Sequence, residues 1–244
     1  DSDESRGLGD VYKRQTHAHA VLTYEKAMRE RNRLLKDMVR DPHWYVAVEW
    51  QLAEAGARIH VNRRRTVLAL MQAQAVTQTS FPTANLTLTH PDPAIENPED
   101  PASLAAGFAE GRSRDMAAGR TLIGPHRADL LAVFASKGMA AKDCSTGEQK
   151  ALLISLILAN GRALIDDFGA PPILLLDEVA AHLDAGRRAA LYDEICALGS
   201  QAFMTGTGPE LFAELGARAQ YGEVAEQDGV SSLIERDRLP PRRV

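Results

Sequence analysis

Residues 173–178 read Ile173-Leu174-Leu175-Leu176-Asp177-Glu178, an apolar run that ends in two carboxylates. Such a run predicts a buried strand of a parallel sheet, and ligands bind at the carboxyl ends of these strands. At that position Asp177 can hold Mg²⁺, and Glu178 can orient an attacking water as a general base. The stretch alone leaves a plainer alternative open, in which the acid only caps the segment that follows.

A second motif, Cys144-Ser145-Thr146-Gly147-Glu148-Gln149-Lys150, lies just before a predicted helix at 151–167. Ser145 and Glu148 fit a capping box, which explains both residues without any function. The same helix start also offers a hydroxyl, backbone N–H groups and a helix dipole, which together suit an anion. The motif resembles the signature loop of ABC-type ATPases, which one subunit lays on the γ-phosphate held by its partner.

A third motif, Ala181-His182-Leu183-Asp184, follows the two acids, where ABC-type ATPases carry a D-loop that crosses the dimer interface. The three motifs have the order and spacing of that class, which argues against capping as their only role. The resemblance implies that Ser145, Gly147 and Gln149 act in trans on the partner's nucleotide. It also implies that Asp184 is the D-loop residue.

Longer stretches resemble the RecF family of bacterial recombinational repair ATPases, over nearly everything from about Thr16 onward. They are Tyr24–Leu35, Gly124-Pro125-His126-Arg127-Ala128-Asp129-Leu130, Ser145–Leu156, Leu174–Asp184 and Phe203-Met-Thr-Gly-Thr207. The Gly-Pro-His-Arg stretch and the Thr-Gly-Glu-Gln-Lys form of the signature are the most specific of these. Without the family, His126 and Arg127 would be taken to close a turn before the next strand.

The RecF resemblance implies an ATPase of DNA repair and replication. ATP and Mg²⁺ would lie between two subunits, with Asp177 on the metal and Glu178 polarising the water. ATP binding would close a homodimer around DNA, bound without sequence preference, and hydrolysis would reopen it. With RecO and RecR, such a protein would help to place RecA on single-stranded gaps.

The sequence departs from an ABC-type ATPase at the phosphate loop. Residues 119–124 have the glycine spacing of a Walker A motif, but Pro125-His126 replace its lysine and hydroxyl residues. Proline also lacks the N–H that a phosphate cradle needs. The chain therefore looks like the C-terminal two-thirds of a longer protein and is expected to hydrolyse nothing alone. A non-catalytic DNA- or protein-binding module is the alternative function.

A transporter ATPase is disfavoured by two features. Transporter-type members place a histidine after the strand that follows Walker B, whereas here residues 202–205 lead into Gly206-Thr207. The long basic helical arm predicted over residues 21–70 also argues against a transporter ATPase.

The arm is predicted from apolar residues at helical spacing over 21–39 and 44–70, separated by Asp41-Pro42. Two helices joined by a short turn form an αα-hairpin, with Asn32 as a possible polar register residue. A solvated face is the expected role of most basic residues on it. These are Arg29, Arg31, Arg33, Lys36, Arg40, Arg63, Arg64 and Arg65. If the arm contacts DNA phosphates, we expect Arg63, Arg64 and Arg65 to do so.

Composition indicates an ordinary globular chain. Of 244 residues, 45% are hydrophobic and 25% charged, which excludes a disordered or collagen-like protein. No run approaches the roughly 20 apolar residues of a membrane span, and two distant cysteines favour a reduced cytoplasmic compartment. The net charge is -5, yet residues 16–78 hold ten basic and six acidic residues.

The expected fold class is α/β, the C-terminal part of an ABC-type ATPase head with a P-loop NTPase-like sheet and an inserted helical arm. Strand-like runs at 130–135, 173–176 and 202–205 alternate with helical ones, as in a largely parallel sheet. Three regions are predicted. They are a non-native or disordered tail at 1–15, the arm at 16–119 with a linker near 90–101, and the ATPase lobe at 120–244.

Overall fold

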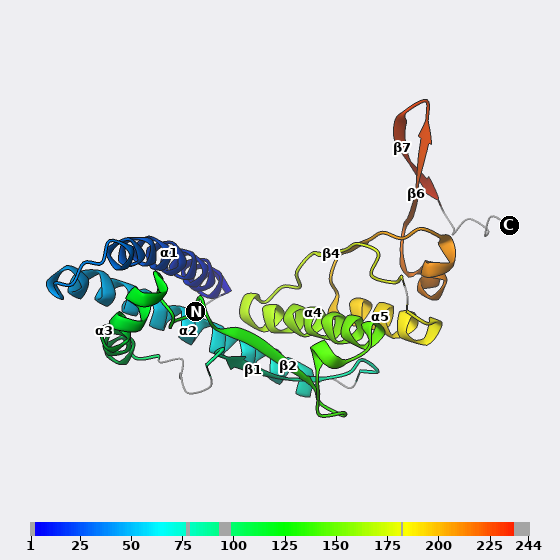
Figure 1. The fold of residues 1–244 in the computed structure, drawn as a ribbon. Coiled ribbons are helices and arrows are strands. Elements are labelled where there is room, and N and C mark those ends of the chain that lie inside the picture. Colours follow the sequence, from blue (N-terminus) through cyan, green and yellow to red (C-terminus); the bar gives the residue numbers. More distant parts are fainter. Residues whose placement is uncertain (1–2, 77–78, 93–98, 182, 237–244) are drawn as a thin grey trace. The chain divides into compact units, whose positions relative to one another are not determined.

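The computed structural model describes residues 3–76, 79–92, 99–181 and 183–236, without the side chains of 3–15 and 227 (Figure 1). The helices are α1 (Asp3–Lys36), α2 (His43–Ala75), α3 (Pro101–Ala118), α4 (Thr146–Phe168) and α5 (Ala185–Leu198), with 3₁₀ segments η1 (Ala141–Asp143) and η2 (Pro209–Arg218). The strands are β1 (Ala84–Thr89), β2 (Asp129–Phe134), β3 (Met139–Ala140), β4 (Leu174–Leu176), β5 (Ala202–Met204), β6 (Tyr221–Gln227) and β7 (Val230–Arg236). The strands form three sheets, ordered β1-β2-β3, β4-β5 and β6-β7.

The chain divides into two compact units. Unit 1 comprises Asp1–Gln72 and Asn85–Val133, and unit 2 comprises Ala73–Ala84 and Phe134–Val244. The arm was expected to end at residue 119, but the border falls after Val133. The loop that follows α3 belongs with the helices of unit 1, because Ile123 is buried in their apolar core.

Unit 1 is built on the αα-hairpin of α1 and α2, against which α3 packs (Figure 1). Asp41-Pro42 separates the two helices as predicted. Tyr24, Leu52 and Phe108, one from each helix, are at most 3% exposed and lie in one core. Trp44 was expected in the apolar stripe but is 67% exposed, because it lies in the first turn of α2, next to the exposed connection.

A charged network lies inside unit 1, contrary to the expectation of a solvated arm. The Arg31 side chain is fully buried and donates to Glu49 at 3.0 Å and Asp115 at 2.6 Å. Arg112 pairs with Glu49 from the other side at 2.5 Å. Arg31 is buried because its stripe on α1 faces both α2 and α3, where two carboxylates balance its charge.

Asn32, the neighbour of Arg31, does not act as a register residue between α1 and α2. Its side-chain oxygen accepts hydrogen bonds from the N–H and hydroxyl of Thr121, both at 2.8 Å. Asn32 therefore ties α1 to the loop after α3.

Residues 3–15 continue helix α1. A helix that is already nucleated extends at little cost, because each added residue contributes one more backbone hydrogen bond. That residues 1–15 are a non-native or disordered tail stays a prediction.

Unit 2 contains part of the predicted alternation of helices and strands, since β4 and β5 alternate with α4 and α5, whereas the strand expected at 130–135 is β2 and belongs to the separate β1-β2-β3 sheet. Strands β4 and β5 are parallel, with Leu174, Leu175 and Leu176 opposite Ala202, Phe203 and Met204. Buried residues of α4, α5 and β4 form one apolar core. Leu175 and Phe203 are 77% and 56% exposed, so one face of this pair lies uncovered by the described residues.

The β6–β7 hairpin near the C-terminus was not predicted. Asp228-Gly229 connects the strands with φ values of 52° and 77°, the conformation of a two-residue hairpin turn. The Asp-Gly pair is a strong local signal that could have revealed it.

Candidate functional site

The two predicted catalytic acids lie at the carboxyl end of β4, where the strand rule places them. Asp177 and Glu178 are both exposed. Thr205 at the end of the neighbouring strand β5 contacts both residues: its hydroxyl donates to the Asp177 carboxylate and accepts the Glu178 N–H at 3.0 Å. The Glu178 carboxylate has no hydrogen-bond partner among the described residues, so it is available to a substrate or a water.

Glu178 has an unusual backbone. Its φ is 46°, in the left-handed region that a non-glycine residue adopts at a cost of about 1–3 kcal/mol. The conformation directs the chain out of β4 into a turn in which Ala181 N–H donates to Glu178 O at 3.1 Å. Strain of this kind persists only where surrounding contacts hold it, and it concentrates at functional sites.

The predicted signature residues surround the N-terminus of α4. Ser145 is the N-cap, and both its N–H (3.0 Å) and its hydroxyl (2.8 Å) donate to the Glu148 carboxylate. The capping interpretation is thus realised, and it leaves the exposed Ser145 accessible. Gln149 folds back onto the loop, where its amide donates to Cys144 O at 3.0 Å.

Packing in the described structure does not require glycine at position 147. A Cβ built on it would meet nothing within 4 Å, although glycine in a helix costs about 1 kcal/mol relative to alanine. Bare backbone at a helix N-terminus allows close approach by an anion. The described residues thus give Gly147 no structural role, and its small size is what a bound phosphate would need.

Glu148 carries a strongly perturbed carboxyl group. Its ion pair with Lys137 and its hydrogen bonds from Ser145 lower the pKa of Glu148 to about 2. At neutral pH the helix start is therefore held by an ionised carboxylate, with Lys137 partly neutralising its charge.

Lys150 connects the signature motif to the acidic turn. Its ammonium group donates to Glu178 O at 3.2 Å and to Ala181 O at 2.6 Å. Residues 145–150 and 177–181 are thus brought together within unit 2. Neither Lys150 nor Thr205 was predicted to have a role at the site. The strand-end rule could have found Thr205, because β5 is the parallel neighbour of β4, but nothing local predicts the Lys150 contacts.

Asp184 is the N-cap of α5. Its carboxylate accepts from Arg187 N at 2.9 Å and is 67% exposed. A capping role and a D-loop role are therefore compatible at this residue. His182 of the same motif lies outside the described residues.

The Gly-Pro-His-Arg stretch is a structural element of unit 1. The Tyr24 hydroxyl lies 2.8 Å from His126 Nδ1, and His126 Nε2 lies 3.1 Å from Thr121 O. Burial lowers the pKa of His126, and the neutral ring with its proton on Nε2 satisfies both contacts. A Cβ at Gly124 would collide with the Tyr24 hydroxyl, so this position requires glycine.

The three arginines predicted to bind DNA lie on α2, in unit 1. Arg63 is half-buried and donates to Pro125 O at 2.5 Å. Arg64 is 63% exposed and pairs with Glu99 at 2.5 Å. Arg65 is exposed, with no ion-pair partner among the described residues. Only Arg64 and Arg65 therefore present their charge to solvent.

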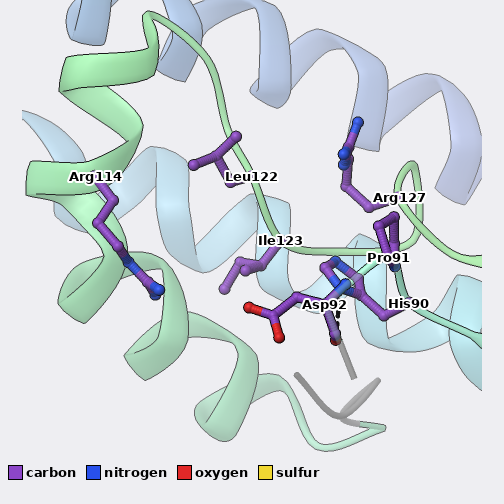
Figure 2. Close-up of a pocket in the computed structure, with 7 residues that line it drawn as sticks. All are labelled: His90, Pro91, Asp92, Arg114, Leu122, Ile123 and Arg127. Carbon is purple, nitrogen blue, oxygen red and sulfur yellow. Dashed lines mark hydrogen bonds between the residues drawn. The ribbon is translucent and has the colours of Figure 1, made fainter. Parts of the chain in front are cut away.

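A hollow of about 200 Å³ in unit 1 contains none of the predicted site residues (Figure 2). It is lined by His90, Pro91, Asp92, Arg114, Leu122, Ile123 and Arg127. Figure 2 shows Arg114 and Asp92 pointing into it from separate segments, so both signs of charge are present. The hollow is therefore not the predicted nucleotide site. Among the described residues no group of three His, Cys, Asp or Glu could hold a metal, and no described helix is apolar enough to cross a membrane.

The α/β unit and the helical arm have the fold class of the C-terminal part of an ABC-type ATPase head, and the residues predicted as its signature and strand-end acids both lie in unit 2. A structure described as the recombination mediator protein RecF-ATPrS in the RecFOR pathway shares the fold. It has a TM-score of 0.69 and 20% identity over 95% of this chain and 62% of that chain. A RecF-ATP structure gives a TM-score of 0.67 at 23% identity, over 89% of this chain and 59% of that one.

The chain is a homologue of the bacterial DNA replication and repair protein RecF. It is 49% identical to RecF of Rhizobium rhizogenes over 86% of this chain and 57% of the relative. RecF of Rhizobium meliloti is 46% identical over the same shares. The chain thus spans a little over half the length of these relatives, and the predicted RecF resemblance is confirmed. No protein-family model matches the chain.

Proposed function

We propose that the chain carries the signature, Walker B and D-loop part of a RecF-type ATPase that acts in DNA repair and replication. The observation that carries this proposal is the joining of two motifs: Lys150 links the signature helix to the turn of Glu178. Both motifs belong to one unit, as a nucleotide-sandwiching head requires. The homology to RecF supplies the biological setting.

The chemistry is ATP hydrolysis between two copies. Ser145, Gly147 and Gln149 contact the γ-phosphate bound by the partner, and the open backbone at Gly147 supports this role. Glu178 polarises the attacking water, for which its carboxylate is unpartnered in the described structure. Asp184 lies in the D-loop at the dimer interface.

The donor set fits Mg²⁺. Magnesium in such sites takes one or two carboxylates and completes its shell with phosphate oxygens and water. Asp177 is an exposed carboxylate oriented by the Thr205 hydroxyl, and no larger protein cage is needed. When bound, the metal neutralises charge on the transferring phosphoryl group.

DNA binding is the second part of the proposal. ATP closes a homodimer on duplex DNA beside single-stranded gaps, and RecO and RecR assist in loading RecA there, in the cytoplasm. Binding is independent of DNA sequence and dependent on salt concentration. Of the three arginines predicted to contact DNA phosphates, the exposed Arg64 and Arg65 make these contacts. The local excess of basic residues over 16–78 supports the arm as the DNA-binding part.

A non-catalytic binding module is the second candidate, because these 244 residues include no Walker A motif. The test uses a fusion of this chain with the part of the Rhizobium rhizogenes relative that the chain does not cover. This fusion is called the completed protein. Glu178→Gln should abolish its ATP turnover while ATP-dependent dimers persist. Turnover at the unaltered rate would remove Glu178 from catalysis, and a completed protein without any ATPase activity would favour the binding module.

A further inference from the structure

The left-handed backbone of Glu178 is held by two side chains from outside its own turn. Thr205 binds the N–H of Glu178 and Lys150 binds its carbonyl oxygen, at 3.0 Å and 3.2 Å. We propose that Thr205 and Lys150 are positioning residues, which keep Glu178 in this conformation and thereby direct its carboxylate. The inference rests on the proposed ATPase function and adds two residues to its machinery.

Thr205 is suited to this role because its hydroxyl is fully committed. The single hydroxyl proton goes to the Asp177 carboxylate, so the oxygen lone pairs remain for the Glu178 N–H. The backbone of Thr205 is fixed in turn, because its N–H donates to Leu176 O at 3.1 Å and extends the β4–β5 pairing. One hydroxyl therefore sets the metal-site acid and the water-polarising acid relative to each other.

Lys150 acts from the other side of the turn. Its ammonium group bridges Glu178 O and Ala181 O, the first and last residues of the turn that leaves β4. The same lysine lies in the first turns of α4, directly after the signature residue Gln149. The loop that contacts the partner's nucleotide is therefore bonded to the catalytic residue of its own subunit.

The first experiment uses the chain as it stands and measures amide hydrogen exchange at Glu178. Thr205→Val removes the hydroxyl at nearly constant volume, and exchange should accelerate at least about tenfold. Thr205→Ser keeps the hydroxyl and should preserve the slow exchange. Thr207→Val is the matched control, because Thr207 is exposed and makes no hydrogen bond to Asp177 or Glu178 among the described residues. Unchanged exchange in Thr205→Val, with the circular dichroism melt retained, would overturn the proposal.

The second experiment measures steady-state ATPase kinetics in the completed protein. Thr205→Val and Lys150→Met should each lower kcat at least about tenfold while KM for ATP stays within about twofold, because water activation rather than ATP binding is lost. Thr205→Ser should restore turnover, and the control Lys142→Met should have no effect.

The outcomes separate the two proposals. If Glu178→Gln is inactive but Thr205→Val and Lys150→Met turn over normally, the positioning role is wrong and the ATPase function stands. If Glu178→Gln itself hydrolyses ATP at the full rate, Glu178 is not catalytic and the positioning role falls with it, whereas the proposed ATPase function fails only if the unaltered completed protein shows no turnover. A rise in KM with unchanged kcat would also overturn the positioning role.

Discussion

Arg31 on α1 and Glu49 on α2 form a 3.0 Å ion pair in which neither side chain is more than 4% exposed. Asp115 of α3 accepts from the same guanidinium at 2.6 Å, and Phe108 O accepts at 2.8 Å. Three helices therefore meet at one buried cation. Such a network adds little to the free energy of unfolding when it is compared with an apolar core of the same volume. Removing one member is nevertheless costly, because it leaves a buried charge without a partner.

Arg31→Met should lower the free energy of unfolding by about 3–5 kcal/mol, because Asp115 loses its buried counter-ion. Urea denaturation followed by circular dichroism measures this loss. The control is Arg29→Met, whose guanidinium is 72% exposed and pairs with Glu25 at 3.7 Å. That change should cost under about 0.5 kcal/mol. Equal midpoints for the two variants would show that the buried network adds nothing.

His60 should make the stability of unit 1 pH-dependent. Burial, Arg63 and His90 lower its pKa from 6.5 to about 4, so the folded state keeps the ring neutral. The unfolded chain binds the proton first as pH falls, and stability is therefore full above about pH 6.5 and lost toward pH 4. Urea midpoints at about pH 7 and about pH 5 should differ accordingly.

His60→Leu should flatten this pH dependence. Both ring nitrogens of His60 are buried without a partner in the described structure, so the apolar replacement should be neutral or stabilising at about pH 7. The exposed His19 gives the matched control, His19→Leu. A His60→Leu variant that still loses stability between pH 6.5 and 4 as the parent does would refute the assignment.

Ser145→Arg should prevent ATP-dependent dimerisation of the completed protein and spare nucleotide binding by each subunit. The long cation would occupy the space in which the partner's phosphate must approach the α4 N-terminus. Light scattering with and without ATP measures the dimer. Ser145→Ala is the control, because it removes only the hydroxyl at the cap, at a cost of about 1 kcal/mol in helix stability. Dimers formed by Ser145→Arg would contradict contact in trans.

Reversing Arg63, Arg64 and Arg65 to Glu should weaken DNA binding by the completed protein and reduce its salt slope. We expect most of this effect from Arg64 and Arg65, with a slope change of about one for each phosphate contact removed. Arg63→Glu should instead destabilise unit 1, because its guanidinium binds Pro125 O. Fluorescence anisotropy across salt concentrations measures the slope, with the exposed Arg120→Glu as control. An unchanged slope would make these residues an ordinary solvated face.

Local patterns in the sequence predicted the elements that position the site. Helix α4 begins at Thr146 with Ser145 as its N-cap, where the capping box indicates the start although the predicted helix range opened at 151, and β4 ends at Leu176, directly before the two acids. The hairpin of α1 and α2 breaks at Asp41-Pro42. Each of these features depends on residues within about four positions of each other, so periodicity, caps and proline suffice to locate them.

The sequence by itself thus determined the class of the protein, its motifs and the presence of the helices and strands that carry them. Tertiary structure alone decided which polar residues are buried and which contact one another. Arg31 reaches Thr121 across 90 positions, Lys150 reaches Glu178 across 28, and Thr205 reaches Glu178 across 27. Long-range contacts of this kind follow from how helices and strands pack, and the burial they create reverses the solvent preference that a charged residue shows in isolation.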